Sequence, residues 1–129
     1  MIKISHLAVN VKNLEGTVGF FTRYFGAEAK TPHYKNPKTG LETCFLSFDD
    51  GSQIELMSWP DLVAKPRGVK VEGFVHLAFS LGSKEAVDNL TSKLKEDGVL
   101  VLSGPRTTGD GYYESLIQDF ESNLLEITV

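Results

Sequence analysis

The chain has 129 residues, 41% hydrophobic and 23% charged, which is enough for one folded domain and too apolar for a disordered one. Thirteen Lys and Arg against 17 Asp and Glu give a net charge of −4, which argues against a nucleic-acid-binding protein. The uncharged apolar runs are far shorter than a membrane span, and Cys44 is the single cysteine. With a single cysteine and no signal-like segment after Met1, we expect a cytoplasmic protein. From the net charge and the short apolar runs, we expect it to bind neither nucleic acid nor membrane.

The first half of the chain predicts one helix among several strands. Residues 2–9 are rich in β-branched side chains and predict a strand. Asn13 can cap a helix whose apolar residues recur at helical spacing until Gly26. A loop with Pro and Gly is expected over residues 30–40. Further strands are expected at residues 41–48 and 53–57.

The second half predicts the same order of elements. A strand is expected over residues 74–81, and a helix capped by Ser83 and ended by Gly98 follows it. Further strands are expected at residues 99–102, 113–119 and 124–129. Residues 60–73, which contain two prolines and two glycines, predict a linker between modules at about 1–59 and 74–129.

An internal repeat relates the two halves. His6-Leu7-Ala8-Val9 resembles His76-Leu77-Ala78-Phe79, and Ile54-Glu55-Leu56 resembles Leu125-Glu126-Ile127. The order strand, helix and strands in each half predicts an α+β chain of two βαβββ modules. Each module is too small to bury a good core alone, so the two must pack together, within one chain or between chains. We expect residues 1–129 to form a single domain.

Each module places one histidine near its first strand and one glutamate in its last. If the modules are related by an approximate two-fold axis, these side chains converge, and they are His6, Glu55, His76 and Glu126. A lone histidine in a strand is more often a hydrogen-bonded core residue, but here the same two types recur in both modules. Two imidazoles and two carboxylates suit one Ni, Zn, Co or Mn ion, and a six-coordinate ion would keep two positions for substrate oxygens.

The sequence resembles the vicinal oxygen chelate superfamily over essentially its whole length. The matching motifs include Ile4-Ser5-His6-Leu7-Ala8-Val9, Ile54-Glu55-Leu56, Gly73-Phe74-Val75-His76-Leu77-Ala78-Phe79 and the closing segment 119–127. This superfamily includes glyoxalase I, methylmalonyl-CoA epimerase, extradiol dioxygenases, and the fosfomycin and bleomycin resistance proteins. The resemblance implies a glyoxalase-like fold, in which two βαβββ modules form an eight-stranded open cup around a metal.

The closest resemblance is to glyoxalase I-like members, and this resemblance implies an enzymatic activity. It implies a divalent-metal-dependent lyase or isomerase that transfers a proton next to a carbonyl of a small oxygen-rich substrate. His6, Glu55, His76 and Glu126 would be the metal ligands, with Glu126 the best candidate for the base and Glu55 its counterpart. It also implies a homodimer with one divalent ion per site.

Other members of the superfamily remain alternatives. The epimerase pattern commonly carries Gln where this chain has Glu55, and bleomycin-binding members bind a drug without catalysis and usually lack the ligands. The fosfomycin enzymes and extradiol dioxygenases use two His and one Glu, which fits less well. Glyoxalase I proteins that use glutathione commonly have Arg and Asn where this chain has Asn10 and Trp59, so the resemblance does not extend to glutathione.

A glycine-rich segment, residues 104–114, supplies two candidate substrate-binding residues. Arg106 is a candidate to hold a substrate carboxylate or phosphate, and Tyr113 to line the cup. The alternative is a flexible hairpin with an arginine on its surface. The segment is not a dinucleotide-binding loop, because no helix follows it.

Overall fold

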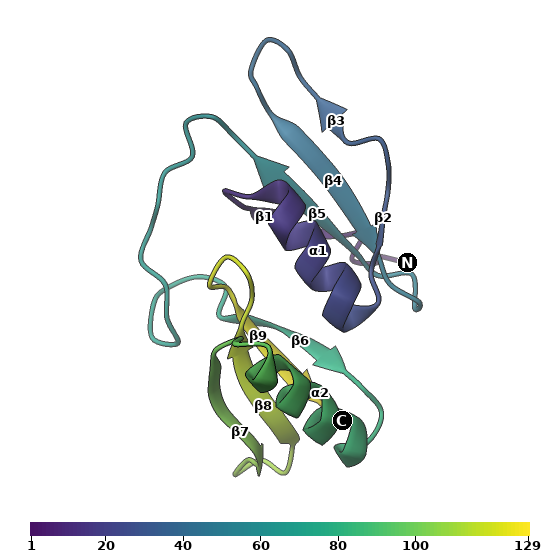
Figure 1. Ribbon diagram of the computed structural model, residues 1–129, viewed down its shortest axis with the longest axis vertical. Coiled ribbons are helices and arrows are strands. Elements are labelled where there is room, and N and C mark those ends of the chain that lie inside the picture. The colour runs from purple at the N-terminus through teal and green to yellow at the C-terminus, as the bar shows by residue number, and fades with distance from the viewer. The chain divides into compact units, whose positions relative to one another are not determined.

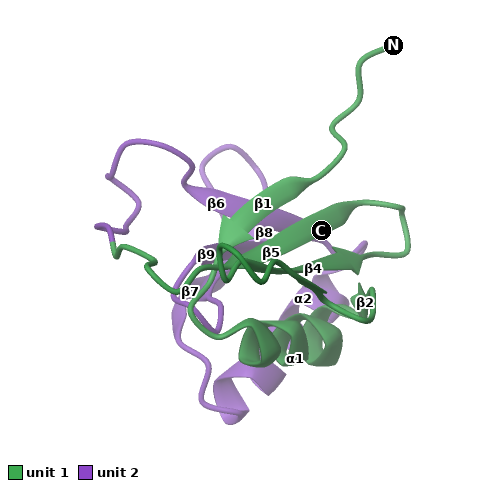
Figure 2. Ribbon diagram, turned by 90° about the horizontal axis from the view of Figure 1, so that it is seen from above, with its two compact units in different colours: residues 1–64 green, residues 65–129 purple.

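The computed structural model describes residues 1–129 and divides them into two compact units, residues 1–64 and 65–129 (Figure 2). Each unit holds one helix and one open sheet (Figure 1). The structure therefore has the α+β class and the repeated modules that the sequence predicts. Neither helix is long and apolar enough to cross a membrane.

The first unit consists of a five-stranded sheet and helix α1. Its elements are β1 (Leu7–Asn10), α1 (Leu14–Phe25), β2 (Glu28–Ala29), β3 (Tyr34–Lys35), β4 (Glu42–Ser47) and β5 (Gln53–Ser58). Strand β1 runs parallel to β5, and β4 lies antiparallel to β5 and pairs with β2 and β3 along its other edge. Helix α1 packs against β4 and β5, where Leu46, Ile54 and Leu56 are buried.

Helix α1 begins and ends where its sequence predicts. The Asn13 side-chain oxygen accepts a hydrogen bond from the Gly16 backbone N–H at 2.8 Å, which satisfies one of the free donors of the first turn. Glu15 adds a negative charge near the positive end of the helix dipole. Gly26 ends the helix with φ at 65°, a left-handed conformation that favours glycine.

The second unit consists of a four-stranded sheet and helix α2. Its elements are β6 (His76–Ser80), α2 (Lys84–Glu96), β7 (Val101–Thr107), β8 (Tyr113–Gln118) and β9 (Leu124–Thr128), and the strand order is β6-β9-β8-β7. Strand β6 runs parallel to β9. The Ser83 hydroxyl caps α2 by accepting a hydrogen bond from the Ala86 N–H at 3.1 Å. The core between α2 and the sheet includes Val87, Leu94 and Ile117.

The repeat holds at the level of strand register. Ala8 pairs with Glu55 in the parallel β1–β5 pair, and Ala78 pairs with Glu126 in the parallel β6–β9 pair. Each histidine lies two residues before its alanine, and side chains two residues apart on a strand share a face. Each unit therefore places its histidine and glutamate on one face of a parallel pair.

Several strands differ from the prediction in length. Strand β1 begins at Leu7 rather than at residue 2, because its pairing with β5 starts at Leu7 and Ile54. Strand β7 continues to Thr107 rather than ending at residue 102, because its pairing with β8 persists through two register shifts. The expected loop 30–40 contains β3, which with β2 makes nine strands rather than eight. Both are only two residues long, too short for a periodic pattern.

The predicted linker, residues 60–73, contains no helix or strand. Arg67 within it donates hydrogen bonds to the Glu121 backbone oxygen and, at 3.2 Å, to the Asn123 side-chain oxygen in the turn between β8 and β9. This part of the linker is thereby tied to the second unit. A single domain built from the two modules stays a prediction.

Candidate functional site

The first unit brings His6 and Glu55 together, and we call them the first pair. His6 Nε2 lies 3.6 Å from Glu55 Oε1, and the two side chains are 35% and 19% exposed. The Ser5 hydroxyl lies 3.0 Å from His6 Nδ1, so the other ring nitrogen, Nε2, faces the carboxylate. A partner on one imidazole nitrogen orients the ring for whatever the other nitrogen binds.

An aromatic ring borders the first pair. Phe45 lies opposite Glu55 in the β4–β5 register. Its ring meets the His6 imidazole edge to face, with centroids 5.1 Å apart and planes at 77°. This contact restrains the imidazole from the side of the sheet and gives the first pair an apolar wall.

The second unit brings His76 and Glu126 together, and we call them the second pair. His76 Nε2 lies 3.3 Å from Glu126 Oε2, and the side chains are 36% and 21% exposed. These values are close to those of the first pair. The two units therefore present matched histidine–carboxylate pairs that remain accessible.

Glu114 on β8 is a third ionisable group beside the second pair. Leu116 lies opposite Glu126, and Glu114 is two residues away on the same face. A hydrogen bond with Glu126 is the main cause that raises the pKa of Glu114 to about 7, and burial and the charge of Glu126 add to it. Its Oε2 atom is buried without a hydrogen-bond partner. A shared proton or a cation would relieve this crowding of carboxyl oxygens.

Arg106 and Tyr113 lie in the β7–β8 hairpin but on different faces of the sheet. Arg106 is exposed and lies opposite Glu114 in register, so it shares the face of the second pair. The Tyr113 hydroxyl donates to Asp88 of α2, a bond that raises the pKa of Tyr113, and the Lys84 ammonium lies 5.2 Å from its ring. The structure thus brings Arg106, but not Tyr113, to the face of the second pair.

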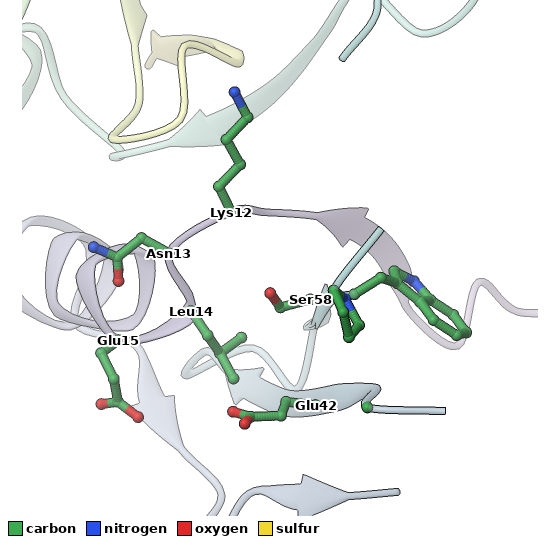
Figure 3. A pocket seen from close by; sticks show the side chains of 9 residues that line it. Lys12, Asn13, Leu14, Glu15, Glu42 and Ser58 are labelled. Carbon is green, nitrogen blue, oxygen red and sulfur yellow. The ribbon is translucent and has the colours of Figure 1, made fainter. Parts of the chain in front are cut away.

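A shallow groove of about 560 Å³ lies where α1 begins (Figure 3). Its lining residues are Lys12, Asn13, Leu14, Glu15, Gly40, Glu42, Ser58, Trp59 and Pro60. Glu42 and Ser58 pair in register on the helix side of the sheet, opposite to the first pair. Lys12 points away from Glu15 and Glu42 (Figure 3). Glu42 and Ser58 thus place part of the groove on the helix side of the sheet, and the groove carries more acidic than basic groups.

Sequence reasoning missed Glu114 as a neighbour of the second pair. The only sequence signal is alternation along β8, which places Glu114, Leu116 and Gln118 on one face. That pattern does not say which residue of β9 lies beside Glu114. The register does, because it sets Leu116 against Glu126.

Within each pair, the donor atoms are spaced like two ligands of one divalent ion. Ligand bonds of about 2.1 Å at right angles place neighbouring donors about 3 Å apart. The separations of 3.6 Å and 3.3 Å are close to that spacing. The structure places no group of three or more His, Cys, Asp or Glu side chains together in a way that could hold a metal ion. A metal site with all four ligands stays a prediction.

Comparison with known proteins identifies the family. Residues 3–127 match the model of the Glyoxalase/Bleomycin resistance protein/Dioxygenase superfamily. The chain belongs to this superfamily, which confirms the resemblance to vicinal oxygen chelate proteins. Neighbours in this fold include enzymes, and at least one was solved with a divalent metal.

Three similar proteins illustrate the range of these neighbours. An uncharacterized protein of Pseudomonas aeruginosa, PA2024, is 25% identical over 97% of this chain and 86% of its own. A mutant of the fosfomycin resistance protein FosX from Listeria monocytogenes, complexed with Mn(II) and 1S,2S-dihydroxypropylphosphonic acid, is 26% identical. The two structures match with a TM-score of 0.77, and the match covers 99% of this chain and 93% of the FosX chain. A glyoxalase I mutant from Zea mays shares the fold with a TM-score of 0.80 and 21% identity, covering 98% of this chain and 44% of that one.

Proposed function

We propose that this protein is a divalent-metal-dependent enzyme of the glyoxalase I type. It would act as a lyase or isomerase on a small oxygen-rich substrate, by proton transfer next to a carbonyl. The observation that carries the proposal is the matched placement of two histidine–glutamate pairs at the same register positions of two parallel strand pairs. Unrelated surface residues would have no reason to repeat both type and register.

In this proposal the metal ligands are His6, Glu55, His76 and Glu126, and they hold one Ni, Zn, Co or Mn ion per site. When bound, the ion supplies Lewis acidity that stabilises negative charge on the substrate oxygens. The chemistry of the donors supports this choice, because imidazole and carboxylate suit these borderline and hard ions. The FosX complex, which contains Mn(II) and a molecule with two hydroxyl groups on adjacent carbons, also supports it.

Glu126 is proposed to carry the proton and Glu55 to act as its counterpart. Glu126 has a neighbouring carboxyl group, Glu114, whose raised pKa lets it keep a proton near neutral pH. A base that gains and loses a proton benefits from a partner that can share that proton. Arg106, on the same face, would hold a substrate carboxylate or phosphate. Tyr113 would contribute by anchoring α2 behind β8.

We further infer a cytoplasmic homodimer, in which the two pairs of a site come either from one chain or from two. Mixing a His6→Ala chain with a His76→Ala chain tests this. If a site draws its modules from two different chains, the mixed dimer contains one intact site and regains metal binding. If both modules come from one chain, every site in the mixture stays damaged and no metal binding returns.

Two other functions are compatible with the same superfamily. One is an isomerase that resembles methylmalonyl-CoA epimerase, and the other is a drug-binding protein without catalysis. The four candidate metal ligands argue against the second, because drug-binding members usually lack them. Assays with methylglyoxal–thiol adducts and with acyl-CoA epimers separate the first from the glyoxalase I-like activity.

The first experiment is elemental analysis of protein purified without chelators. We expect close to one equivalent of metal per site, lost in His76→Ala and in Glu126→Ala. His33→Ala is the matched control, because His33 is the one histidine outside the two pairs and its Nδ1 lies 3.3 Å from a Glu15 carboxylate oxygen. A protein without metal that takes none up on reconstitution would overturn the enzymatic proposal.

A further inference from the structure

A strip of side chains continues from the first pair along the same face of the first sheet. Ala8 and Asn10 follow His6 on β1, and Met57 and Trp59 follow Glu55 along β5 and just beyond its end. Residues two apart on a strand share a face, so the strip extends about 13 Å from Glu55 to Trp59. Of these four side chains, Asn10 is polar, and those of Ala8, Met57 and Trp59 are mainly apolar.

Trp59 is fixed at the far end of this strip. Its indole N–H donates a hydrogen bond to the Asn10 side-chain oxygen at 3.1 Å, which joins the end of β5 to β1. The side chain remains partly exposed, and it is the single tryptophan of the chain. An aromatic ring that is already held in place loses little conformational entropy when a ligand packs against it.

The strands beneath the strip offer no positive charge. Strands β1, β4 and β5 contain neither Lys nor Arg, whereas they place the carboxylate of Glu55 on this face. The basic residue that lines the groove together with Trp59, Lys12, lies beyond the end of β1. A substrate carboxylate or phosphate over the strip would therefore lack a charge partner from these strands. The arginine of the second unit's candidate site, Arg106, has no counterpart here.

We infer that Trp59, held by Asn10, is a specificity-determining residue that receives an uncharged apolar or aromatic arm of the substrate, with Ala8 and Met57 beneath that arm. This inference rests on the proposed function, in which the substrate oxygens lie at the metal near the first pair. The reacting end of the substrate would be rich in oxygen, and the arm over the first unit would be apolar.

Three hydroxamates test the inference, because each carries two adjacent oxygens that chelate a metal and they differ only in the arm. Acetohydroxamate has no arm, 4-phenylbutanohydroxamate has an aromatic arm, and glutaric monohydroxamate has an arm that ends in a carboxylate. Their affinities for the Mn(II)-loaded protein are measured by calorimetry. Changes in Trp59 fluorescence provide a second readout in the wild type.

We expect the phenyl arm to strengthen binding about tenfold over acetohydroxamate, as stacking on a fixed aromatic ring allows. Any gain from the carboxylate arm should be unchanged in Trp59→Ala, because Arg106 rather than Trp59 would hold a carboxylate. Trp59→Ala should remove the gain from the phenyl arm and leave the affinities for Mn(II) and acetohydroxamate unchanged. Trp59→Phe should keep part of the gain, and Asn10→Ala should reduce it by freeing the ring. Phe120→Ala, which removes an exposed aromatic ring in the β8–β9 turn, is the control and should change nothing.

Two results would overturn the inference alone: a phenyl arm that adds no affinity over acetohydroxamate, or a phenyl-arm gain that survives Trp59→Ala. A protein that binds no Mn(II) or other divalent ion would overturn the proposed function and this inference together. The two failures are therefore distinguishable by the metal titration that precedes the hydroxamate series.

Discussion

The two histidine–glutamate pairs have the same residue types and the same register, but their surroundings differ. The first pair faces the ring of Phe45, and the Ser5 hydroxyl lies beside its imidazole. The second pair faces a carboxyl group, Glu114, whose oxygen Oε2 is buried without a partner. An aromatic wall restrains a ligand, whereas a neighbouring carboxyl group gives a base somewhere to share a proton. We therefore expect the first pair mainly to hold the ion and the second to move the proton.

The largest expected effect comes from removing the proton-carrying oxygen of each glutamate in turn. Glu126→Gln should lower kcat about 1000-fold, within the range for loss of a general acid–base group, because the amide cannot take up the proton. Glu55→Gln should lower kcat much less. Both are measured on metal-reconstituted protein with the metal content determined for each variant. Equal losses, or a greater loss in Glu55→Gln, would contradict the division of roles between the pairs.

The units also differ in how the helix is fastened to its sheet. In the second unit the buried Thr91 hydroxyl bonds both the Val87 carbonyl at 2.7 Å and the Ser115 hydroxyl at 2.8 Å. In the first unit the Thr17 hydroxyl bonds only the Asn13 carbonyl, within the same segment, at 2.8 Å. The second unit therefore has a polar link between helix and sheet that is absent at Thr17.

Thr91→Val should lower the free energy of unfolding by about 1–3 kcal/mol, because it leaves the Ser115 hydroxyl buried without its partner. Thr17→Val, the matched change in α1, should cost less. Urea denaturation monitored by Trp59 fluorescence and by circular dichroism measures both. Adding Ser115→Ala to Thr91→Val should restore part of the loss, and a double variant whose losses simply add would show that the two hydroxyls are not coupled.

The carboxyl group beside the second pair predicts that stability depends on pH. Glu114 has a pKa raised from 4.5 to about 7 in the folded protein, mainly by its hydrogen bond with Glu126. Between these values the folded state keeps a proton that the unfolded state has released. The stabilising contribution of the protonated group is therefore complete below pH 4.5 and is lost as the pH rises towards 7.

Glu114→Gln should flatten this part of the stability profile, because the amide does not titrate and can still donate a hydrogen bond to Glu126. The measurement is urea denaturation of the metal-free protein at several pH values from about 4 to 8. Phe45→Leu, a change beside the first pair, is the control and should leave the slope as in the wild type. Equal slopes in the wild type and Glu114→Gln would show that Glu114 is not the group responsible.

Much of this comparison could be predicted from the sequence, because the features that determine it are local or repeated. The caps at Asn13 and Ser83 set the helix starts through contacts with residues three positions away. The internal sequence repeat predicted that each module would place one histidine and one glutamate at corresponding positions. Other features depend on pairing between distant segments, which no local pattern encodes. These are the short strands β2 and β3 and the position of Glu114 beside Glu126.

The smallest expected effect concerns the Ser5 hydroxyl, which has no equivalent beside His76, where Val75 precedes the histidine. Ser5→Ala should weaken metal binding about tenfold, because removing a group that orients a ligating imidazole typically costs 10- to 100-fold. Val75→Ala is the matched control and should leave the affinity unchanged. Competition with a chelator of known affinity measures both. An unchanged affinity in Ser5→Ala would mean that the edge contact with Phe45 alone is enough to orient His6, so the aromatic wall rather than the hydroxyl would distinguish the first pair from the second.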